Sequence, residues 1–170
     1  MTAIDAGIAG SWKGAVFRIC GYTGLKVDIQ AQRLIKANAV AAVVFLAVGG
    51  LMGLGVAMTR WPAVHLLPAE WFYLVLTGHG TNVLLFWIIF FEIAVLYLAS
   101  AVLLNSRIAT PALAWIGFAL MVTGAVMANY AILKGDSSVM FTSYPPMQAS
   151  HWFYLGLILF AVGALVGVGV

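Results

Sequence analysis

The sequence is short of charge and of cysteine, and both shortages restrict what the chain can be. Eight Lys and Arg and five Asp and Glu side chains are spread over 170 residues, of which 64% are hydrophobic. So little charge and so much apolar sequence predict an integral membrane protein. The single cysteine, Cys20, excludes an internal disulfide and a cysteine cluster for iron or zinc, and we expect a buried or inert thiol.

Several common catalytic patterns are also missing. The sequence contains no phosphate-binding glycine loop, no nucleophile with a matching base and no paired carboxylates. The net charge of +3 does not indicate a nucleic-acid partner, because the basic residues lie where membrane topology requires them. Metal or haem binding is the chemistry that remains.

Four apolar stretches lie between the ionisable residues, at 37–58, 71–104, 108–133 and 152–170. Each is close to or above the roughly 20 residues that an α-helix needs to cross a bilayer. The sequence therefore predicts an all-α fold, a polytopic bundle of four transmembrane helices. We assign residues 1–36 to an N-terminal segment and residues 37–170 to the transmembrane part, and we find no internal repeat.

The basic residues are distributed unequally between the two sides of the predicted bundle. Arg107 separates the second span from the third, and Arg60 and Lys134 lie on the opposite side. Five more basic residues precede the first span: Lys13, Arg18, Lys26, Arg33 and Lys36. Positive charge accumulates on the cytoplasmic side of membrane proteins, so we expect the N-terminus there.

The N-terminal segment has no continuous apolar core and no small-residue cleavage site, so we do not expect a removed signal peptide. We expect it to lie on the inner face of the membrane. The Cys-Gly-Tyr-Thr-Gly stretch at 20–24 predicts a turn. Residues 30–36 predict a helix that runs directly into the first span, with Asp28 as a candidate cap.

His79 lies some eight residues inside the second span, roughly 12 Å along the helix axis. An imidazole in hydrocarbon needs a partner, and a metal is a frequent one. Gly78 and Gly80 leave the neighbouring helix surface open, and we expect a flat macrocycle to fit against it. Three residues continue about the same stripe: Asn82, Phe86 and Phe90. A histidine that is only hydrogen-bonded to a neighbouring helix is the alternative.

Glu92 is the other costly residue of the second span, because a carboxylate there must be protonated or face a hydrated cavity. A proton route is one reading, and a neutral carboxylic acid bonded to an adjacent helix is the other. Glu92 lies about 220° around the helix from His79, so the two need not share a site. His65 and His151 lie at the outer boundary, where water or headgroups can satisfy them.

Small residues recur in two of the spans, where they would allow neighbouring backbones to approach closely. We interpret them as packing positions rather than as a site. In the first span they are Gly49, Gly50, Gly53 and Gly55, and in the fourth Gly156, Gly163, Gly167 and Gly169.

Three segments together resemble a known family. They are Leu-Thr-Gly-His-Gly at 76–80, Ser-Val-Met-Phe-Thr-Ser-Tyr-Pro-Pro-Met at 138–147 and Trp-Phe-Tyr-Leu-Gly at 152–156. In order and spacing they resemble the N-terminal third of subunit I of haem-copper oxidases, with the B-type branch most similar. The resemblance runs from about Gln32 to the end of the chain. It is more specific than the histidine alone, because it spans three helices.

The resemblance implies that His79 is an axial ligand of the low-spin haem b and relays electrons for the reduction of dioxygen to water, coupled to proton translocation. It implies a copper-containing subunit II and cytochrome c or a similar donor as partners, and the plasma membrane of a prokaryote as the location. Tyr144 would lie near the gas-access route, although an interfacial tyrosine that only anchors a turn is the alternative. The resemblance assigns no role to Glu92.

By the same resemblance, the second axial histidine, the copper ligands and the ligand of the second haem belong to later helices. We therefore expect that the 170 residues cannot reduce oxygen alone, and that the remainder of subunit I or a complementing chain completes them.

Three alternatives remain open. A nitric oxide reductase of the same superfamily would share these early helices. A small four-helix cytochrome b would use His79 and His151 on one haem, but their different depths argue against it. A non-catalytic assembly subunit would leave His79 purely structural.

Overall fold

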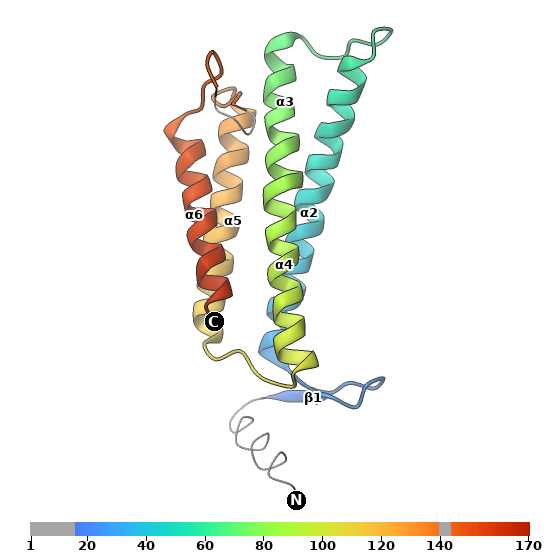
Figure 1. Ribbon diagram of the computed structural model, residues 1–170, viewed down its shortest axis with the longest axis vertical. Helices are drawn as coiled ribbons and strands as arrows, with labels where there is room; N and C mark the ends of the chain where they lie inside the picture. The colour runs from blue at the N-terminus through green and yellow to red at the C-terminus, as the bar shows by residue number, and fades with distance from the viewer. Residues whose placement is uncertain (1–15, 140–143) are drawn as a thin grey trace, which may run out of the picture.

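The computed structural model describes residues 16–139 and 144–170, and its elements are four long helical rods above a small β-hairpin (Figure 1). Helix α2 spans Ile29–Arg60, and the second rod runs without a break through Ala69–Leu103. Helices α5 and α6 span Pro111–Leu133 and His151–Val168. All four are long and apolar enough to cross a membrane, which confirms the predicted bundle.

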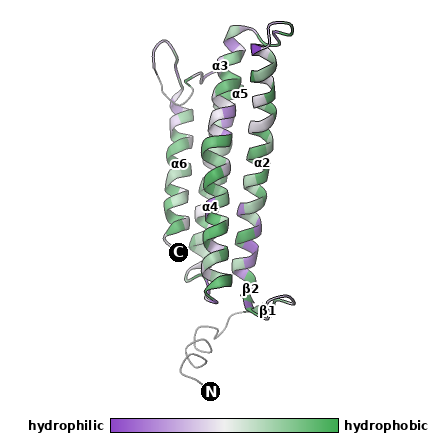
Figure 2. Cartoon of the chain, turned by 45° about the vertical axis from the view of Figure 1, so that its right-hand side comes forward, coloured by the Kyte–Doolittle hydropathy of each residue, from purple (hydrophilic) through white to green (hydrophobic). Residues whose placement is uncertain are grey.

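The helix boundaries differ by a few residues from the predicted spans. Helix α5 begins at Pro111 rather than at residue 108, because proline is favoured in the first helical turn, where its missing N–H is not needed. Apolar residues cover most of the length of each rod (Figure 2). That surface suits lipid or further apolar helices rather than water.

A short β-hairpin precedes the first rod, so the fold is not purely α. Strands β1 (Phe17–Ile19) and β2 (Lys26–Asp28) pair antiparallel, with Phe17 opposite Asp28. The predicted turn at 20–24 joins them, and Gly24 has a φ of +68°, a conformation that favours glycine. The strands could not be predicted from the sequence, because each has only three residues, too few to show an alternating pattern.

Helix α2 begins at the position that the sequence predicts. The Asp28 side chain accepts a hydrogen bond from the backbone N–H of Gln30 at 3.2 Å, which caps the first turn. From there the helix continues without interruption to Arg60. The N-terminal hairpin is therefore joined directly to α2, the helix that contacts His79.

The second rod is not a uniform α-helix. It consists of α3 (Ala69–Thr81), the π-helix η1 (Asn82–Phe86), α4 (Trp87–Leu98) and a second π-helix, η2 (Ala99–Leu103). A π-turn inserts one extra residue and rotates everything after it relative to a regular helix. Angular positions that are calculated with 100° per residue through residues 82–86 are therefore incorrect for the residues that follow.

Helices α5 and α6 form a hairpin whose backbones touch. A Cβ atom on Gly156 would lie 2.9 Å from the backbone nitrogen of Ala128, and one on Gly163 would lie 2.7 Å from that of Met121. Gly156 and Gly163 therefore act as the packing positions that the sequence predicts. Their counterparts on α5, Gly117 and Gly124, were not singled out from the sequence.

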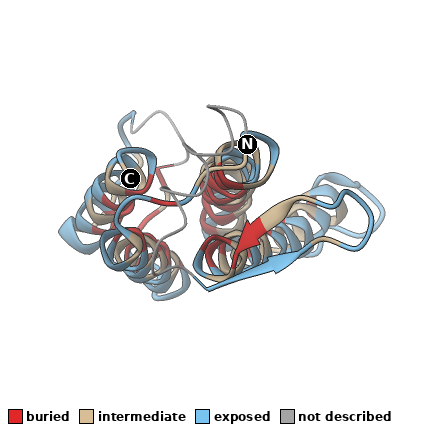
Figure 3. Ribbon diagram, turned by 90° about the horizontal axis from the view of Figure 1, so that it is seen from below, coloured by how far each residue is buried: buried red, intermediate tan, exposed pale blue. Residues whose placement is uncertain are grey.

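A cluster of phenylalanines joins this hairpin to the other two rods. The rings of Phe86 and Phe160 lie 4.7 Å apart between centroids, and Phe90 lies 5.5 Å from both Phe45 and Phe160. The view along the rods shows the buried residues where the two pairs of helices face each other (Figure 3). This cluster is the core of the described bundle.

Candidate functional site

His79 lies in the last turn of α3, about 15 Å along the axis from the start of that helix. Its Nδ1 atom is 2.8 Å from the carbonyl oxygen of Gly49 on α2. A carbonyl oxygen can only accept, so Nδ1 carries the proton and the ring is the tautomer whose Nε2 has a free lone pair. Among the described residues Nε2 has no hydrogen-bond partner.

Gly53 of α2 makes room for this ring, and Gly49 makes room for the next turn of the second rod. A Cβ on Gly53 would lie 2.7 Å from both Cε1 and Nδ1 of His79. A Cβ on Gly49 would lie 2.9 Å from Cβ of Asn82 and 3.3 Å from the backbone nitrogen of Val83. The imidazole therefore lies directly against the backbone of α2, in a position that any larger residue at 53 would fill.

The residues that were expected to extend this face do follow His79 along the side that faces α2, but other helices cover them. Asn82, Phe86 and Phe90 are fully buried in the core, and the phenylalanines pack against α2 and α6. The prediction that they form a surface for a flat macrocycle is wrong. Their burial against neighbouring helices explains the error, because the sequence of one helix does not show which of its faces another helix covers.

Asn82 links the turn of His79 to α5. Its Nδ2 atom donates to Oδ1 of Asn129 at 2.7 Å and to the carbonyl oxygen of Gly78 at 2.7 Å. In return, Nδ2 of Asn129 donates to Oδ1 of Asn82 at 3.1 Å and to the carbonyl oxygen of Ala125 at 2.9 Å. From the sequence, Asn82 was expected only as part of a stripe and Asn129 was not singled out, although polar amides in two predicted spans were a visible signal.

The other predicted site residues are not close to this arrangement. Glu92 is exposed on α4, and Tyr144 is 69% exposed in the loop before α6. His65 lies exposed in the loop after α2, and His151 is the exposed first residue of α6. The structure brings none of these four side chains into contact with His79.

The donor atoms around His79 suit a cofactor rather than a bare ion. Within residues 16–139 and 144–170, no three His, Cys, Asp or Glu side chains come together as a metal site. A haem needs no such cluster, because its own ring supplies four equatorial nitrogens and the protein supplies axial ligands. One imidazole with a fixed tautomer and a lone pair on Nε2 meets that requirement.

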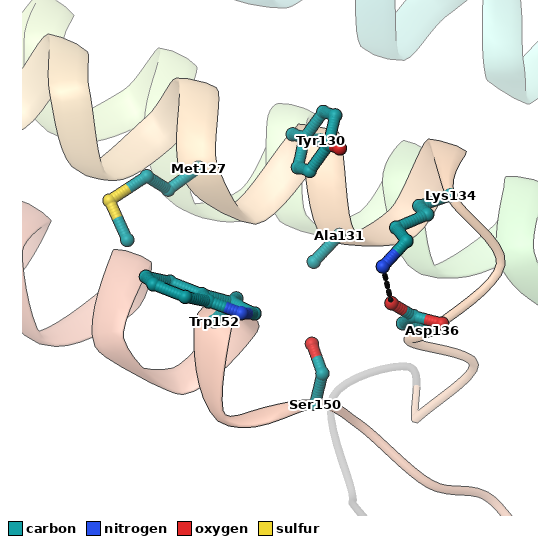
Figure 4. Close-up of a pocket in the computed structure, with 7 residues that line it drawn as sticks. All are labelled: Met127, Tyr130, Ala131, Lys134, Asp136, Ser150 and Trp152. Carbon is teal, nitrogen blue, oxygen red and sulfur yellow. Dashed lines mark ion pairs between the residues drawn. The ribbon is translucent and has the colours of Figure 1, made fainter.

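A cavity of about 410 Å³ lies elsewhere, between the C-terminal end of α5 and the N-terminal end of α6 (Figure 4). Met127, Tyr130 and Trp152 form its apolar wall, while an ion pair of 3.3 Å between Lys134 and Asp136 lies at its polar end. The ion pair is exposed to solvent and contributes little to stability. None of the candidate site residues that the sequence predicts lines this cavity, and we assign it no chemistry.

Cys20 corrects another expectation. It is only partly buried, at the base of the hairpin turn, rather than enclosed. Hydrogen bonds from the Thr23 side chain and from the backbone of Thr23 and Tyr22 stabilise the thiolate and lower the pKa of Cys20 to about 7. The lowered pKa favours the thiolate, which is the reactive form of the side chain.

Comparison with known proteins supports the resemblance seen in the sequence. Residues 33–170 match the model of a family described as cytochrome c and quinol oxidase polypeptide I. The chain belongs to this family. The match covers all four membrane helices and includes the turn of His79.

Two relatives illustrate how much of the family's protein this chain represents. Cytochrome c oxidase subunit 1 of Thermus thermophilus is 33% identical over 107 residues, which are 61% of this chain and 18% of the relative. A cryo-EM structure of a heme-copper terminal oxidase dimer superposes with a TM-score of 0.68 at 26% identity, covering 80% of this chain and 24% of that one. This oxidase polypeptide I segment thus spans about a fifth to a quarter of the relatives that it matches.

Proposed function

We propose that this oxidase segment binds a low-spin haem b through His79 and relays electrons within the catalytic subunit of a B-type haem-copper oxidase. The whole subunit would reduce dioxygen to water and translocate protons. The observation that carries the proposal is the hydrogen bond from His79 Nδ1 to the Gly49 carbonyl oxygen, in a segment that matches the family. This bond leaves Nε2 as the only ring nitrogen that can bind iron.

Gly49 and Gly53 hold the imidazole ring of His79 in different ways. Gly49 accepts the Nδ1 proton, which selects the tautomer and increases the electron donation of the imidazole. Gly53 provides the space into which the ring fits. When bound, the haem supplies a one-electron carrier whose potential depends on its axial ligands.

We assign Glu92 and Tyr144 no part in haem binding, but one to a proton route and the other to a gas-access route. We propose Glu92 as a proton-route residue because a carboxylate in an apolar helix is costly without a function. The change Glu92→Gln should then lower proton translocation, and unchanged pumping would remove it from the route. We propose Tyr144, which lies beside two prolines at the outer end of the bundle, as a residue near the gas-access route.

The short length of this segment, compared with its relatives, implies that further sequence or other chains complete the oxidase. The relatives are several times longer, so we propose that the rest of subunit I or a complementing chain supplies the second axial histidine, the second haem and copper. A copper-containing subunit II and cytochrome c or a similar donor would deliver electrons. The excess of basic residues at the hairpin end favours a cytoplasmic N-terminus in a prokaryotic plasma membrane.

A reduced-minus-oxidised optical spectrum of the native membrane complex, with and without carbon monoxide, tests this function. We expect a low-spin b signal together with a second haem that responds to carbon monoxide. A b signal without the carbon monoxide response would favour a small cytochrome, and the absence of haem would overturn the proposal.

A further inference from the structure

The paired amides of Asn82 and Asn129 lie immediately after the turn that presents His79, and they connect that turn to α5. We propose that Asn129 is a positioning residue for His79. It would hold the rotation of the α3 turn and so set the hydrogen bond from the imidazole to Gly49, and through that bond the potential of the haem. The inference rests on the proposed haem ligation by His79.

Hydrogen bonds form an unbroken connection from α5 to Gly78, the residue before His79. The backbone of α5 accepts from Asn129 at Ala125, Asn129 pairs with Asn82, and Asn82 donates to the carbonyl oxygen of Gly78. All four N–H bonds of the two amides are used. Because Asn82 is fully buried, water cannot replace Asn129 as its partner.

The backbone at this position needs such an external support. Asn82 is the first residue of η1, where the N–H of Trp87 donates to the Asn82 carbonyl oxygen in a π-turn. A π-turn interrupts the regular i→i−4 ladder that otherwise fixes the rotation of one turn relative to the next. The contacts of the side chains around it, and of Asn82 above all, then decide how the turn of His79 is oriented.

The turn of His79 is held from two sides. On one side α2 accepts from the imidazole at Gly49 and touches Cβ of Asn82. On the other side α5 holds the amide of Asn82. If the α5 contact is removed, the turn can rotate away from α2 and weaken the Nδ1 hydrogen bond. A weaker bond makes the imidazole a poorer electron donor, which raises the haem potential.

The first variant is Asn129→Leu in the complete membrane complex, with Tyr97→Phe as its matched control. Asn129→Leu removes the two interhelical hydrogen bonds to Asn82. The control removes one interhelical hydrogen bond near the other end of the rod, from the Tyr97 hydroxyl to the Gly167 carbonyl oxygen at 2.8 Å. The readouts are the midpoint potential and the electron paramagnetic resonance spectrum of the low-spin haem. We expect an upward shift of the potential and altered g-values in Asn129→Leu, with neither change in Tyr97→Phe.

A second variant separates positioning from simple stability. The single change leaves the buried amide of Asn82 without a partner, which destabilises the fold, whereas Asn82→Leu combined with Asn129→Leu removes both amides. We expect the double variant to regain thermal stability while its potential stays shifted. A potential that returns to the wild-type value with the stability would overturn the proposal.

Failure of this inference can be distinguished from failure of the proposed function. If the wild-type complex shows a low-spin haem that depends on His79, while Asn129→Leu and Tyr97→Phe have the same potential and g-values, only the role of Asn129 is wrong. If Asn129→Leu yields no complex, the midpoint potential and g-values are measured in the double variant instead. A haem that persists without His79 would overturn both proposals.

Discussion

The Nδ1 atom of His79 lies 2.8 Å from the carbonyl oxygen of Gly49, a residue 30 positions earlier in the chain and on another helix. The first membrane helix therefore determines which nitrogen of the imidazole faces away from the protein backbone. Because the acceptor belongs to the backbone, no side-chain substitution at position 49 removes it directly. Changes that move the ring are the more informative test.

The change Gly53→Ala should displace the imidazole. Its Cβ would lie 2.7 Å from two ring atoms, closer than real Cβ contacts, and the backbone of α2 cannot retreat without disturbing its packing. We expect the low-spin haem content of the purified complex to fall by more than half on the measured optical spectrum, at similar protein yield.

Gly50→Ala is the matched control for this change. It lies on the same helix three residues earlier, and a Cβ there would meet nothing within 4 Å. Its haem content should equal that of the wild type. Equal haem content in Gly53→Ala and Gly50→Ala would show that the ring does not lie against α2.

The change Gly124→Ala should separate the α5–α6 hairpin. The new methyl group would lie 2.6 Å from the backbone nitrogen of Phe160, and backbone atoms cannot yield as a flexible side chain can. Overpacking of this kind costs about 1–3 kcal/mol. A lower midpoint in a thermal unfolding scan would report it. Gly55→Ala, whose methyl group would meet atoms only at 3.6 Å and beyond, should leave the midpoint unchanged or slightly higher.

Cys20 should react as a thiolate near neutral pH. Hydrogen bonding to Thr23 is the main cause of its lowered pKa of about 7, so the thiolate persists above that pH and is lost as the pH falls below it. The alkylation rate with iodoacetamide, followed against pH by mass spectrometry, should have its midpoint near this value.

Removal of the Thr23 hydroxyl should move that midpoint toward the ordinary thiol pKa of about 8.5. The change Thr23→Ala therefore slows alkylation at pH 7 and has little effect at high pH, where both proteins are deprotonated. Superimposable rate profiles for the two proteins would contradict the assigned cause. Cys20 is the only cysteine of the chain, so it gives the only labelled site.

The membrane helices, one helix cap and one turn could be predicted from the sequence. Four apolar runs, the cap at Asp28 and the turn at 20–24 all correspond to local chemistry that a short window of sequence contains. The short strands β1 and β2 could not be found this way, because three residues carry no measurable period. The two π-helices were equally hidden, since nothing in the apolar residues there marks an inserted residue.

Only part of the candidate site could be singled out from the sequence. His79 was identifiable because an imidazole is costly in an apolar helix. Its acceptor at Gly49 and the space at Gly53 depend on how α2 packs against α3, which the sequence of one helix does not contain. The stripe through Phe86 and Phe90 was predicted to be open but is buried against α2 and α6, which the sequence of one helix does not show. The predicted segment Met-Phe-Thr-Ser at 140–143 lies outside the described residues.

The most direct test of the account is a reduced-minus-oxidised spectrum of the complex with His79→Ala, compared with His65→Ala and His151→Ala. Of the three histidines, His79 is the one that lies inside a helix long and apolar enough to cross a membrane and has its Nδ1 hydrogen-bonded. His65 is exposed in the loop after α2, and His151 is exposed at the start of α6. We predict that the low-spin b signal disappears only in His79→Ala. A signal that persists there, or that depends equally on His151, would contradict the assignment of His79 as the haem ligand of this oxidase segment.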